Sequence, residues 1–510
     1  MEEDFSKFVH GFSITGVGIV YSAIMYYGAA LLAVNLLGPA LYGLYSLAFM
    51  VPNVAIYFLL FGLDVTAARY IAHNLGKNNT GKALKCAQTI FVVRIPVAIF
   101  SMIVFFLLSD PIAALLGEDI VLGLQLLSVF IFLYLVVRYL LGVLQGYFLF
   151  KQRTIAEAVL NTLLMVLIIP FVRWGFGYVS PILSFIFGLL VGIILSFYFL
   201  YRARIPVYKI AFEGIAALTE YLRFSFHVYI SDSFYIAYIW VGTIVMKLYA
   251  MPVEIVGYYR AMFAITNTVI VISYGITIVL YPMLSELNAR KEHARLAFGL
   301  CEVIKVTLGL SIPAAFGMLF ISQPLVAVMF PKYVPAVDLL RIFSLRMIFL
   351  PLWSVLATAL LTLERERAQA VLAVFLCGFS FVLSVVLGIV SVEGIALAST
   401  VGLTCAVVLQ YIVLKRRIPA VSVGPVLKFC LSAAVMCGVV LLVLQLNTGD
   451  AVKIVLSMVC AVSVYTVLVL RTGAVTQTDL DLARSGLSAF GQTGKMLEPV
   501  LTWAQWIRDL

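Results

Sequence analysis

Two stretches of this chain, ALYGLYSLAFMVPN at 40–53 and IVGYYRAMFAITN at 255–267, share a residue pattern about half a chain length apart. Self-similarity at a fixed distance is the signature of an internal repeat. The sequence therefore predicts a fold built from two related halves. At an offset of 214 positions, the matched pairs are Gly43 with Gly257, Tyr45 with Tyr259, Phe49 with Phe263 and Asn53 with Asn267.

The composition places both halves in a membrane. Of the 510 residues, 64% are hydrophobic and 11% are charged, and the mean hydropathy is +1.11. Soluble domains are about half apolar and about a quarter charged, so the composition excludes a soluble protein. The apolar run that follows MEEDFSK is too long for the hydrophobic region of a signal peptide. We therefore expect the first helix to remain as a span.

Fourteen apolar runs are long enough for membrane-spanning helices, which need about 20 residues each. The short connection VEG at 392–394 separates two of these runs, because joining them would break the alternation of loop charges described next. The expected spans are 9–35, 43–63, 86–109, 120–144, 156–174, 180–201, 224–247, 257–281, 298–322, 337–363, 369–391, 395–414, 428–446 and 454–470.

The basic residues of the loops predict the orientation. Nineteen lysines and arginines lie in the loops of one side, against four on the other side, and cytoplasmic loops are the ones enriched in these residues. We therefore expect a multi-pass protein of the cell membrane with both termini in the cytoplasm. The nineteen are Arg69, Lys77, Lys82, Lys85, Lys151, Arg153, Arg202, Arg204, Lys209, Arg223, Arg290, Lys291, Arg295, Arg365, Arg367, Lys415, Arg416, Arg417 and Lys428; the four are Arg173, Lys247, Lys332 and Lys453.

The two copies of the repeat begin at spans two and eight, so they cross the membrane in the same direction. Parallel repeats of this kind are found in transporters. The expected fold is an all-α polytopic membrane protein with two parallel-repeat six-helix lobes and two C-terminal helices. Its expected parts are an N-terminal lobe (1–201), a cytoplasmic connector (202–223), a C-terminal lobe (224–414), the extra helices 13 and 14 (415–470) and a cytoplasmic tail with an amphipathic helix (471–510).

Several segments resemble the polysaccharide transporters, the Wzx-type flippases for lipid-linked oligosaccharides. In the first half these segments are NLLGPALYGLYSLAF (35–49) and FGLDVTAARYIAHNLGKNNTGKA (61–83). In the second half they are EIVGYYRAMFAI (254–265), LYPMLSELNARKE (280–292) and FPKYVPAVDLLRIFSL (330–345). The resemblance implies the fold of the multidrug/oligosaccharidyl-lipid/polysaccharide exporter superfamily, in which two lobes alternate between inward-open and outward-open states.

The resemblance also implies a function and its partners. The expected activity is translocation of a polyprenyl-phosphate-linked or pyrophosphate-linked oligosaccharide from the cytoplasmic to the outer leaflet, for surface polysaccharide or glycan export. The partners would be this polyprenyl-linked glycan, the lipid bilayer and polysaccharide biosynthesis proteins. A lipid II flippase and a cation-coupled multidrug exporter of the same fold stay open as alternatives. A membrane glycosyltransferase or polymerase would need a large extracytoplasmic loop, which the sequence lacks.

Four arginines inside expected spans are candidates for the substrate path. A charged side chain within a span costs about 2.5–3.5 kcal/mol on insertion scales and tends to face a cavity. The planar guanidinium suits phosphate oxygens. The alternative is a structural ion pair or a side chain that reaches toward the membrane surface, as expected for Arg341, which has Asp338 three residues before it. The four candidates are Arg94, Arg138, Arg260 and Arg346.

Asp232 is the carboxylate placed well inside a span, in HVYISDSFYIAY (227–238). It is a candidate for binding a coupling proton or Na⁺, and the alternative is a fixed partner for an arginine. Asp64 is expected to be a residue of a helix end or loop. Asn53 and Asn267 could either hydrogen-bond sugar hydroxyls or bridge helices, a contact worth about 1 kcal/mol or less.

The remaining residues predict no chemistry of their own. The repeat residues Gly43 and Gly257 favour tight helix junctions with a neighbouring tyrosine as an aromatic anchor at the membrane interface. The seven cysteines and four histidines show no metal-ligand spacing, and the sequence has neither a nucleotide-binding motif nor a catalytic triad. We expect no enzyme activity, no metal site, no resident cofactor and no nucleic-acid partner, because the orientation already explains the basic loops.

Overall fold

The computed structural model describes residues 2–209, 211–273, 276, 284, 287, 292–415, 423–476, 502, 505 and 508. Every regular element among these residues is a helix. The α-helices are α1 (Glu2–Leu60), α2 (Leu63–Gly76), α3 (Thr80–Leu107), α4 (Ser109–Leu116), α5 (Val121–Gly146), α6 (Phe150–Arg173), α7 (Ser180–Arg202), α8 (Ile215–Leu248), α9 (Val253–Asn267), α11 (His293–Met329), α12 (Val337–Thr362), α13 (Glu366–Gly388), α14 (Val392–Lys415), α15 (Val423–Leu444) and α16 (Asp450–Arg471), and the two 3₁₀ helices are η1 (Gly177–Val179) and η2 (Pro331–Ala336).

The helices confirm the expected spans. Thirteen segments of the described chain are long and apolar enough to cross a membrane. The first of them, Gly18–Gly76, covers the two expected spans 9–35 and 43–63, and each of the other twelve matches one further expected span. The chain is therefore an all-α polytopic membrane protein. The expected span 257–281 and the basic residues Arg290 and Lys291 extend outside the described residues, as does most of the expected tail helix.

The two expected spans within α1 meet at Gly38. This glycine has φ 73° and ψ 174°, values outside the helical region. Pro39 follows it, and a proline disfavours the helical conformation of the residue before it. Glycine adopts positive φ without the clash that a Cβ would cause. The pair Gly38–Pro39 therefore divides α1 into two helical segments.

The expected separation of α13 and α14 is confirmed, but its position differs from the prediction. The break lies at 389–391, and VEG at 392–394 forms the first turn of α14 instead of the connection. A Cβ on Gly394 would overlap the carbonyl oxygen of Leu387. Glycine is therefore what allows α14 to begin so close to the end of α13.

The described chain forms two compact units that each combine distant segments. Unit 2 comprises Val17–Ala264 and Glu366–Gly402, and unit 1 comprises the described residues of Met1–Gly16, Ile265–Arg365 and Leu403–Leu510. This division differs from the boundaries predicted from the repeat, which stay predictions.

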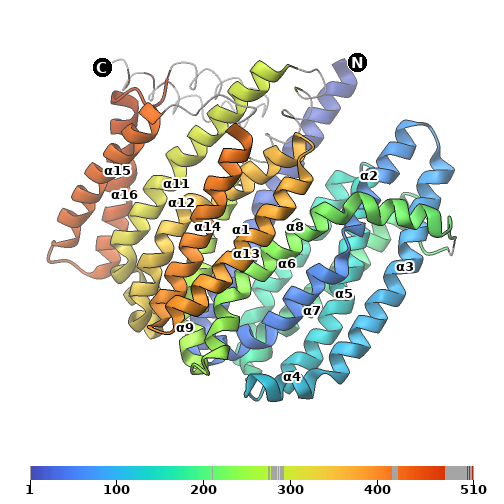
Figure 1. Ribbon diagram of the computed structural model, residues 1–510, viewed down its shortest axis with the longest axis horizontal. Coiled ribbons are helices and arrows are strands. Elements are labelled where there is room, and N and C mark those ends of the chain that lie inside the picture. The colour runs from blue at the N-terminus through green and yellow to red at the C-terminus, as the bar shows by residue number, and fades with distance from the viewer. Residues whose placement is uncertain are drawn as a thin grey trace. The chain divides into compact units, whose positions relative to one another are not determined.

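Within unit 2, α5 is the central helix and packs against α2, α3 and α7 (Figure 1). Most of its side chains are buried, as expected of a helix that is apolar on all sides. The helices α6 and α7 pack along each other, and α8 packs along α13. Segments far apart in the sequence therefore complete one unit.

The connector between α7 and α8 is attached to α2 and α3. The backbone N–H of Glu213 donates to Thr89 Oγ1 at 2.9 Å, and the Tyr221 hydroxyl donates to the Glu213 carboxylate. The Tyr221 ring lies edge-on to Tyr70, with ring centroids 4.7 Å apart. Burial and the hydrogen bond to Glu213 raise the pKa of Tyr221, so its hydroxyl remains a donor. The helix α8 begins at Ile215, so the later part of the expected connector is helical.

Within unit 1, α11 packs against α12, α15 and α16. The Tyr465 hydroxyl donates to the Gly309 carbonyl at 2.7 Å, which links α16 to α11. A small apolar core joins Ile312, Phe429 and Val469 from three different helices. The two C-terminal helices are therefore packed against α11 within the fold of unit 1.

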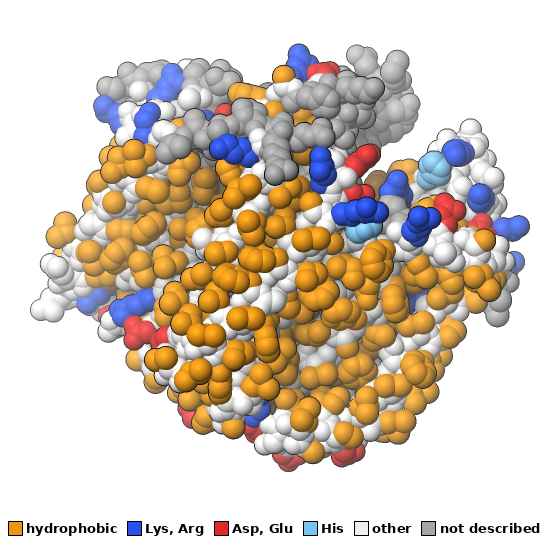
Figure 2. All heavy atoms as spheres, in the orientation of Figure 1, with side chains coloured by type: hydrophobic (Ala, Val, Ile, Leu, Met, Phe, Trp, Pro, Cys, Tyr) orange, Lys and Arg blue, Asp and Glu red, His pale blue; other side chains and the backbone are white. Residues whose placement is uncertain are grey.

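Large hydrophobic side chains remain exposed on the outer faces of the helices (Figure 2). Examples are Phe100 and Leu107 on α3, each 68% exposed, and Val371 on α13, 67% exposed. A soluble protein rarely exposes apolar surface on this scale. These faces are suited to contact lipid.

The repeat residues have equivalent structural roles. A Cβ on Gly43 would overlap the carbonyl oxygen of Val253, and a Cβ on Gly257 would overlap that of Pro39. The contact is reciprocal, because Pro39 and Val253 stand four residues before the two glycines. It confirms the expected tight junctions, here between α1 and α9.

The repeat tyrosines stack on the repeat phenylalanines. The rings of Tyr45 and Phe49 lie 5.6 Å apart, and those of Tyr259 and Phe263 lie 6.3 Å apart. Tyr259 is buried. The expectation of an aromatic anchor at the membrane interface is therefore wrong for Tyr259, because helix packing encloses its ring.

Candidate functional site

The candidate site of unit 2 is built around an ion pair inside the membrane-spanning region. Arg138 on α5 donates to Asp64 Oδ2 on α2 from Nε at 3.1 Å and from Nη2 at 2.6 Å. The Asp64 side chain is 8% exposed and that of Arg138 is 35% exposed. Each charge offsets the cost of the other in the membrane. About a third of the Arg138 side chain stays accessible although its guanidinium is bound to Asp64.

Local backbone geometry places Asp64 at this depth. Phe61 and Gly62 both have positive φ, which ends α1 and starts α2. Asp64 therefore lies in the first turn of α2, where the helix dipole favours a negative charge. A Cβ on Gly142 would lie 2.5 Å from the Asp64 carbonyl oxygen, so glycine allows α5 to approach closely. The sequence predicts Asp64 as a residue of a helix end or loop, and the structure confirms the helix end. The sequence does not predict the pairing of Asp64 with Arg138.

Asp232 on α8 belongs to the same neighbourhood. It lies within electrostatic range of Asp64 and Arg138, and its side chain is exposed although it stands within the span Ser225–Leu248. The next residue, Ser233, donates to the Tyr57 carbonyl at 3.1 Å and holds α8 against α1. We call Asp64, Arg138 and Asp232 the charge cluster.

Tyrosines surround the charge cluster. Tyr57 and Tyr134 lie beside Arg138, and both rings are partly accessible. Tyr134 packs on Phe130, with ring centroids 5.6 Å apart. Phe130 is buried, so Tyr134 connects the neighbourhood of Arg138 to the aromatic core of unit 2.

Arg260 on α9 is held by an aromatic face and a backbone carbonyl. Its guanidinium carbon lies 3.8 Å from the centroid of the Trp240 ring, and Nη1 donates to the Ile239 carbonyl at 3.0 Å. Trp240 Nε1 in turn donates to Asn53 Oδ1 at 2.9 Å. Arg260 and Trp240 are both buried. These contacts join α1, α8 and α9.

Arg94 on α3 binds the end of α1. Nη1 donates to the Leu59 carbonyl at 3.1 Å, and Nη2 donates to the Leu60 carbonyl at 2.7 Å. The last carbonyls of a helix have no partner within the helix, and basic side chains often bind them. Arg94 is fully buried. In this structure Arg94 holds α3 to the end of α1 through backbone carbonyls, a contact that differs from the ion pair and the surface-directed side chain given as alternatives.

Arg346 and Asn267 contact each other within unit 1. Arg346 Nη1 on α12 donates to Asn267 Oδ1 at the end of α9, at 3.3 Å. Arg346 is 1% exposed. Asn53 accepts from Trp240 and Asn267 accepts from Arg346, so both repeat asparagines connect helices. This geometry corresponds to the helix-bridging alternative for both residues.

Sequence reasoning missed the partner of Arg138 and the nearby tyrosines. The depth of the two residues could have predicted the pair, because Asp64 and Arg138 both lie near the expected cytoplasmic ends of their spans. The expected local partner of Arg341 is confirmed, since its Nη1 lies 2.8 Å from Asp338 Oδ1. Groups of three or more metal-ligating side chains are absent from the part of the chain that the structure describes.

Comparisons with known proteins identify relatives of this fold. The family described as "Polysaccharide biosynthesis protein" matches residues 8–288. The structure of the lipid II flippase MurJ in an inward-closed conformation has a TM-score of 0.72 and 15% identity, over 89% of this chain and 97% of that chain. An inward-facing multidrug resistance transporter of the MATE family, in the MOP superfamily, has a TM-score of 0.67 and 17% identity, over 80% and 98%.

A MATE transporter in complex with MaD3S is also similar, with a TM-score of 0.61 and 16% identity, over 82% of this chain and 96% of that chain. No curated protein sequence matches the chain. At these identities, the solved structures establish a common fold. The fold is that of the MOP superfamily, as the sequence resemblance implied.

Proposed function

We propose that this chain, which belongs to the polysaccharide biosynthesis protein family, flips a lipid-linked oligosaccharide between membrane leaflets by alternating access. The lipid would be a polyprenyl phosphate or pyrophosphate, and the direction would be from the cytoplasmic to the outer leaflet. The observation that carries the proposal is the accessible Arg138 inside a span, at 35% exposure, among tyrosine side chains. The observation places a cationic side chain beside two tyrosines at a depth where charges are expensive.

The chemistry of the cluster suits a sugar phosphate. Arg138 uses Nε and Nη2 to bind Asp64, so its Nη1 edge is directed away from that contact and would bind a phosphate oxygen. Tyr57 and Tyr134 would supply hydroxyls for sugar groups. Asp64 would keep the guanidinium oriented when no substrate is bound. The polyprenyl chain would remain in the lipid.

We assign Asp232 the role of binding a coupling proton or Na⁺. Its support is an exposed carboxylate within a span, in electrostatic range of Arg138 and Asp64. Binding of a proton or Na⁺ to Asp232 would change the net charge of the cluster independently of the substrate. The other candidate residues would act on the substrate path only indirectly, by holding the helices that form it. They are Arg94, Arg260, Arg346, Asn53 and Asn267.

The orientation proposed from the loop charges would place both termini on the cytoplasmic side of the cell membrane. The cluster would then lie nearer the cytoplasmic ends of its helices, because Asp64 follows the turn that ends α1 on the side of the basic loops. This position suits first contact with a head group from the inner leaflet.

Headgroup translocation in proteoliposomes tests the proposal. A fluorescent polyprenyl-pyrophosphate sugar and an impermeant quencher would report protein-dependent movement between leaflets, with and without a proton or Na⁺ gradient. We expect Arg138→Gln to lower the flipping rate at least about tenfold, since one charge-assisted contact to a phosphate is worth about 1.5–3 kcal/mol.

A double variant separates binding from folding. Arg138→Gln alone leaves Asp64 as an unpaired charge, which destabilises a protein, so Arg138→Gln with Asp64→Asn should regain the melting temperature but not the flipping rate. Recovered flipping in the double variant would contradict a substrate-binding role for Arg138. Arg341→Gln is the matched control, because its ion pair is local and exposed. Export of cationic dyes without headgroup movement would favour the multidrug exporter.

A further inference from the structure

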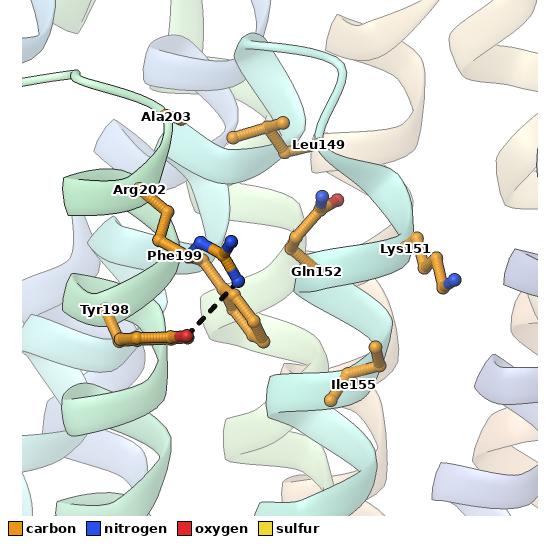
Figure 3. A pocket seen from close by; sticks show the side chains of 8 residues that line it. All are labelled: Leu149, Lys151, Gln152, Ile155, Tyr198, Phe199, Arg202 and Ala203. Atoms are coloured by element: carbon orange, nitrogen blue, oxygen red, sulfur yellow. Dashed lines mark hydrogen bonds between the residues drawn. The ribbon is translucent and has the colours of Figure 1, made fainter.

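A pocket outside the charge cluster lies between the start of α6 and the end of α7 (Figure 3). Its volume is about 450 Å³, within the range of ligand pockets. It combines polar side chains with apolar walls and contains no carboxylate. The lining residues are Leu149, Lys151, Gln152, Ile155, Tyr198, Phe199, Arg202 and Ala203.

Three positive features lie in or at the rim of this pocket. The Arg202 guanidinium reaches from α7 toward α6 and contacts the Tyr198 hydroxyl at 3.4 Å (Figure 3). Gln152 faces the same space from α6, and Lys151 stands at its rim with its ammonium directed outward (Figure 3). Lys151 has a long, exposed side chain, so rotation about its bonds can bring its charge over the pocket.

The third feature is the backbone at the start of α6. Leu149 occupies the N-cap position and provides no side-chain cap. The first N–H groups of a helix have no partner within it, and with the helix dipole they attract anions. The N-cap and first turn of α6, whose residues Leu149, Lys151 and Gln152 line the pocket, therefore lie beside Arg202. The C-terminus of α7 carries a partial negative charge, which would repel an anion. Arg202 in the last turn of α7 offsets this partial charge.

The apolar walls extend the site toward the membrane. Ile155 and Phe199 lie one turn deeper than the charged groups, and Ile194 on α7 is 65% exposed below them. Tyr198 has the place of an aromatic residue at the membrane surface. A ligand with one anionic head and an acyl chain matches this order of charge, aromatic ring and hydrocarbon.

We infer that this pocket binds the phosphate head of an anionic glycerophospholipid, of the phosphatidylglycerol class, from the leaflet on the side of the basic loops. One arginine, one lysine and one helix N-terminus match a single phosphate. Basic pockets between helices on the cytoplasmic side are a recurrent form of lipid recognition. The inference stands apart from the proposed flippase activity, because the pocket shares no residue with the charge cluster.

Native mass spectrometry of the full chain, released from nanodiscs of phosphatidylglycerol and phosphatidylcholine, tests the inference. We expect the wild type to retain phosphatidylglycerol preferentially. The double variant Lys151→Gln with Arg202→Gln should retain about thirtyfold less, as about 1 kcal/mol for each of the two basic residues implies. The matched control, Lys77→Gln with Lys85→Gln, removes two exposed charges of the same side and should retain the wild-type amount.

Equal retention by the pocket variant and the wild type would overturn the inference, as would an equal loss in the control. Glycerol phosphate and a short polyprenyl phosphate serve as competitors. Displacement of the lipid by glycerol phosphate at equal concentration would assign the pocket to a free phosphate. Preferential displacement by polyprenyl phosphate would assign it to the lipid carrier. Persistence of phosphatidylglycerol against both competitors is the expected result.

Discussion

The arginines within the spans differ in what surrounds their guanidinium groups. Arg94, Arg260 and Arg346 are buried and donate to carbonyl or amide oxygens. Arg138 pairs with Asp64 and keeps a third of its side chain accessible. A buried, bound guanidinium holds helices together, whereas an accessible one can bind a solute. The surroundings of each guanidinium therefore distinguish Arg138 from the three arginines that hold helices together.

Arg94→Met should destabilise the protein. It leaves the Leu59 and Leu60 carbonyls without their donors in a buried site, and each unsatisfied buried group costs about 1–3 kcal/mol. We expect a lower melting temperature in detergent, measured by tryptophan fluorescence. Arg341→Met is the control, since an exposed pair is worth about 0–1 kcal/mol. Equal melting of the two variants would show that α1 does not depend on Arg94.

Asp232→Asn should uncouple transport from the gradient while the fold is kept. The amide has nearly the shape of the carboxylate but carries no negative charge, so it takes up no proton near neutral pH and attracts Na⁺ much more weakly. The side chain is exposed, so little packing changes. We expect the flipping rate in proteoliposomes to become equal with and without an ion gradient. An unchanged response to the gradient would leave Asp232 as a structural neighbour of Arg138.

At the scale of elements, the repeat is a pair of close helix contacts. Gly43 and Gly257 each lie against a carbonyl oxygen four residues before the other. The rings that follow them stack in the same way on both copies, and the asparagines that follow accept hydrogen bonds from neighbouring helices. The pattern visible in the sequence is therefore the trace of one packing arrangement used twice.

Gly43→Ala and Gly257→Ala should each lower the melting temperature in detergent. The added methyl group meets a backbone oxygen in both cases, so a helix has to move, and overpacking of this kind costs about 1–3 kcal/mol. Gly378→Ala on α13 is the control, because nothing lies within 4 Å of its added Cβ. There, the higher helix propensity of alanine should keep or raise stability. A tolerated change at both Gly43 and Gly257 would contradict the tight junction.

At the scale of the whole molecule, the basic residues of the loops predict which side of the membrane each loop faces. Lys77 follows α2, and Lys332 lies in η2 between α11 and α12. The proposed orientation places Lys77 in the cytoplasm and Lys332 outside. Both side chains are exposed, so a reagent on the correct side of the membrane can reach them.

Cysteine labelling tests this orientation. In a background in which the seven natural cysteines are replaced, an impermeant maleimide should label Lys332→Cys in intact cells. Lys77→Cys should be labelled only after permeabilisation, with the unsubstituted background as the blank. The reverse pattern would invert the orientation and place the charge cluster near the outer leaflet.

The membrane class, the expected spans, the repeat and the resemblance to polysaccharide transporters could all be predicted from the amino-acid sequence. These properties depend on local features: the length of apolar runs against the thickness of a bilayer, and loop charge. Gly38–Pro39 and Gly394 also act locally. The break at Gly38 lies between the expected spans 9–35 and 43–63, whereas the sequence places the α13–α14 break three residues too late.

The contacts between charged side chains depend on how the helices pack and could not be predicted. The pairing of Arg138 with Asp64, the binding of Arg94 to the end of α1 and the stacking of Arg260 on Trp240 join residues from different helices. Hydrophobic patterning gives the depth of a residue in its span but neither the rotation of the helix nor its neighbours. For the same reason the pocket of α6 and α7 has no signal in the sequence, since its two halves adjoin only after the helices have packed.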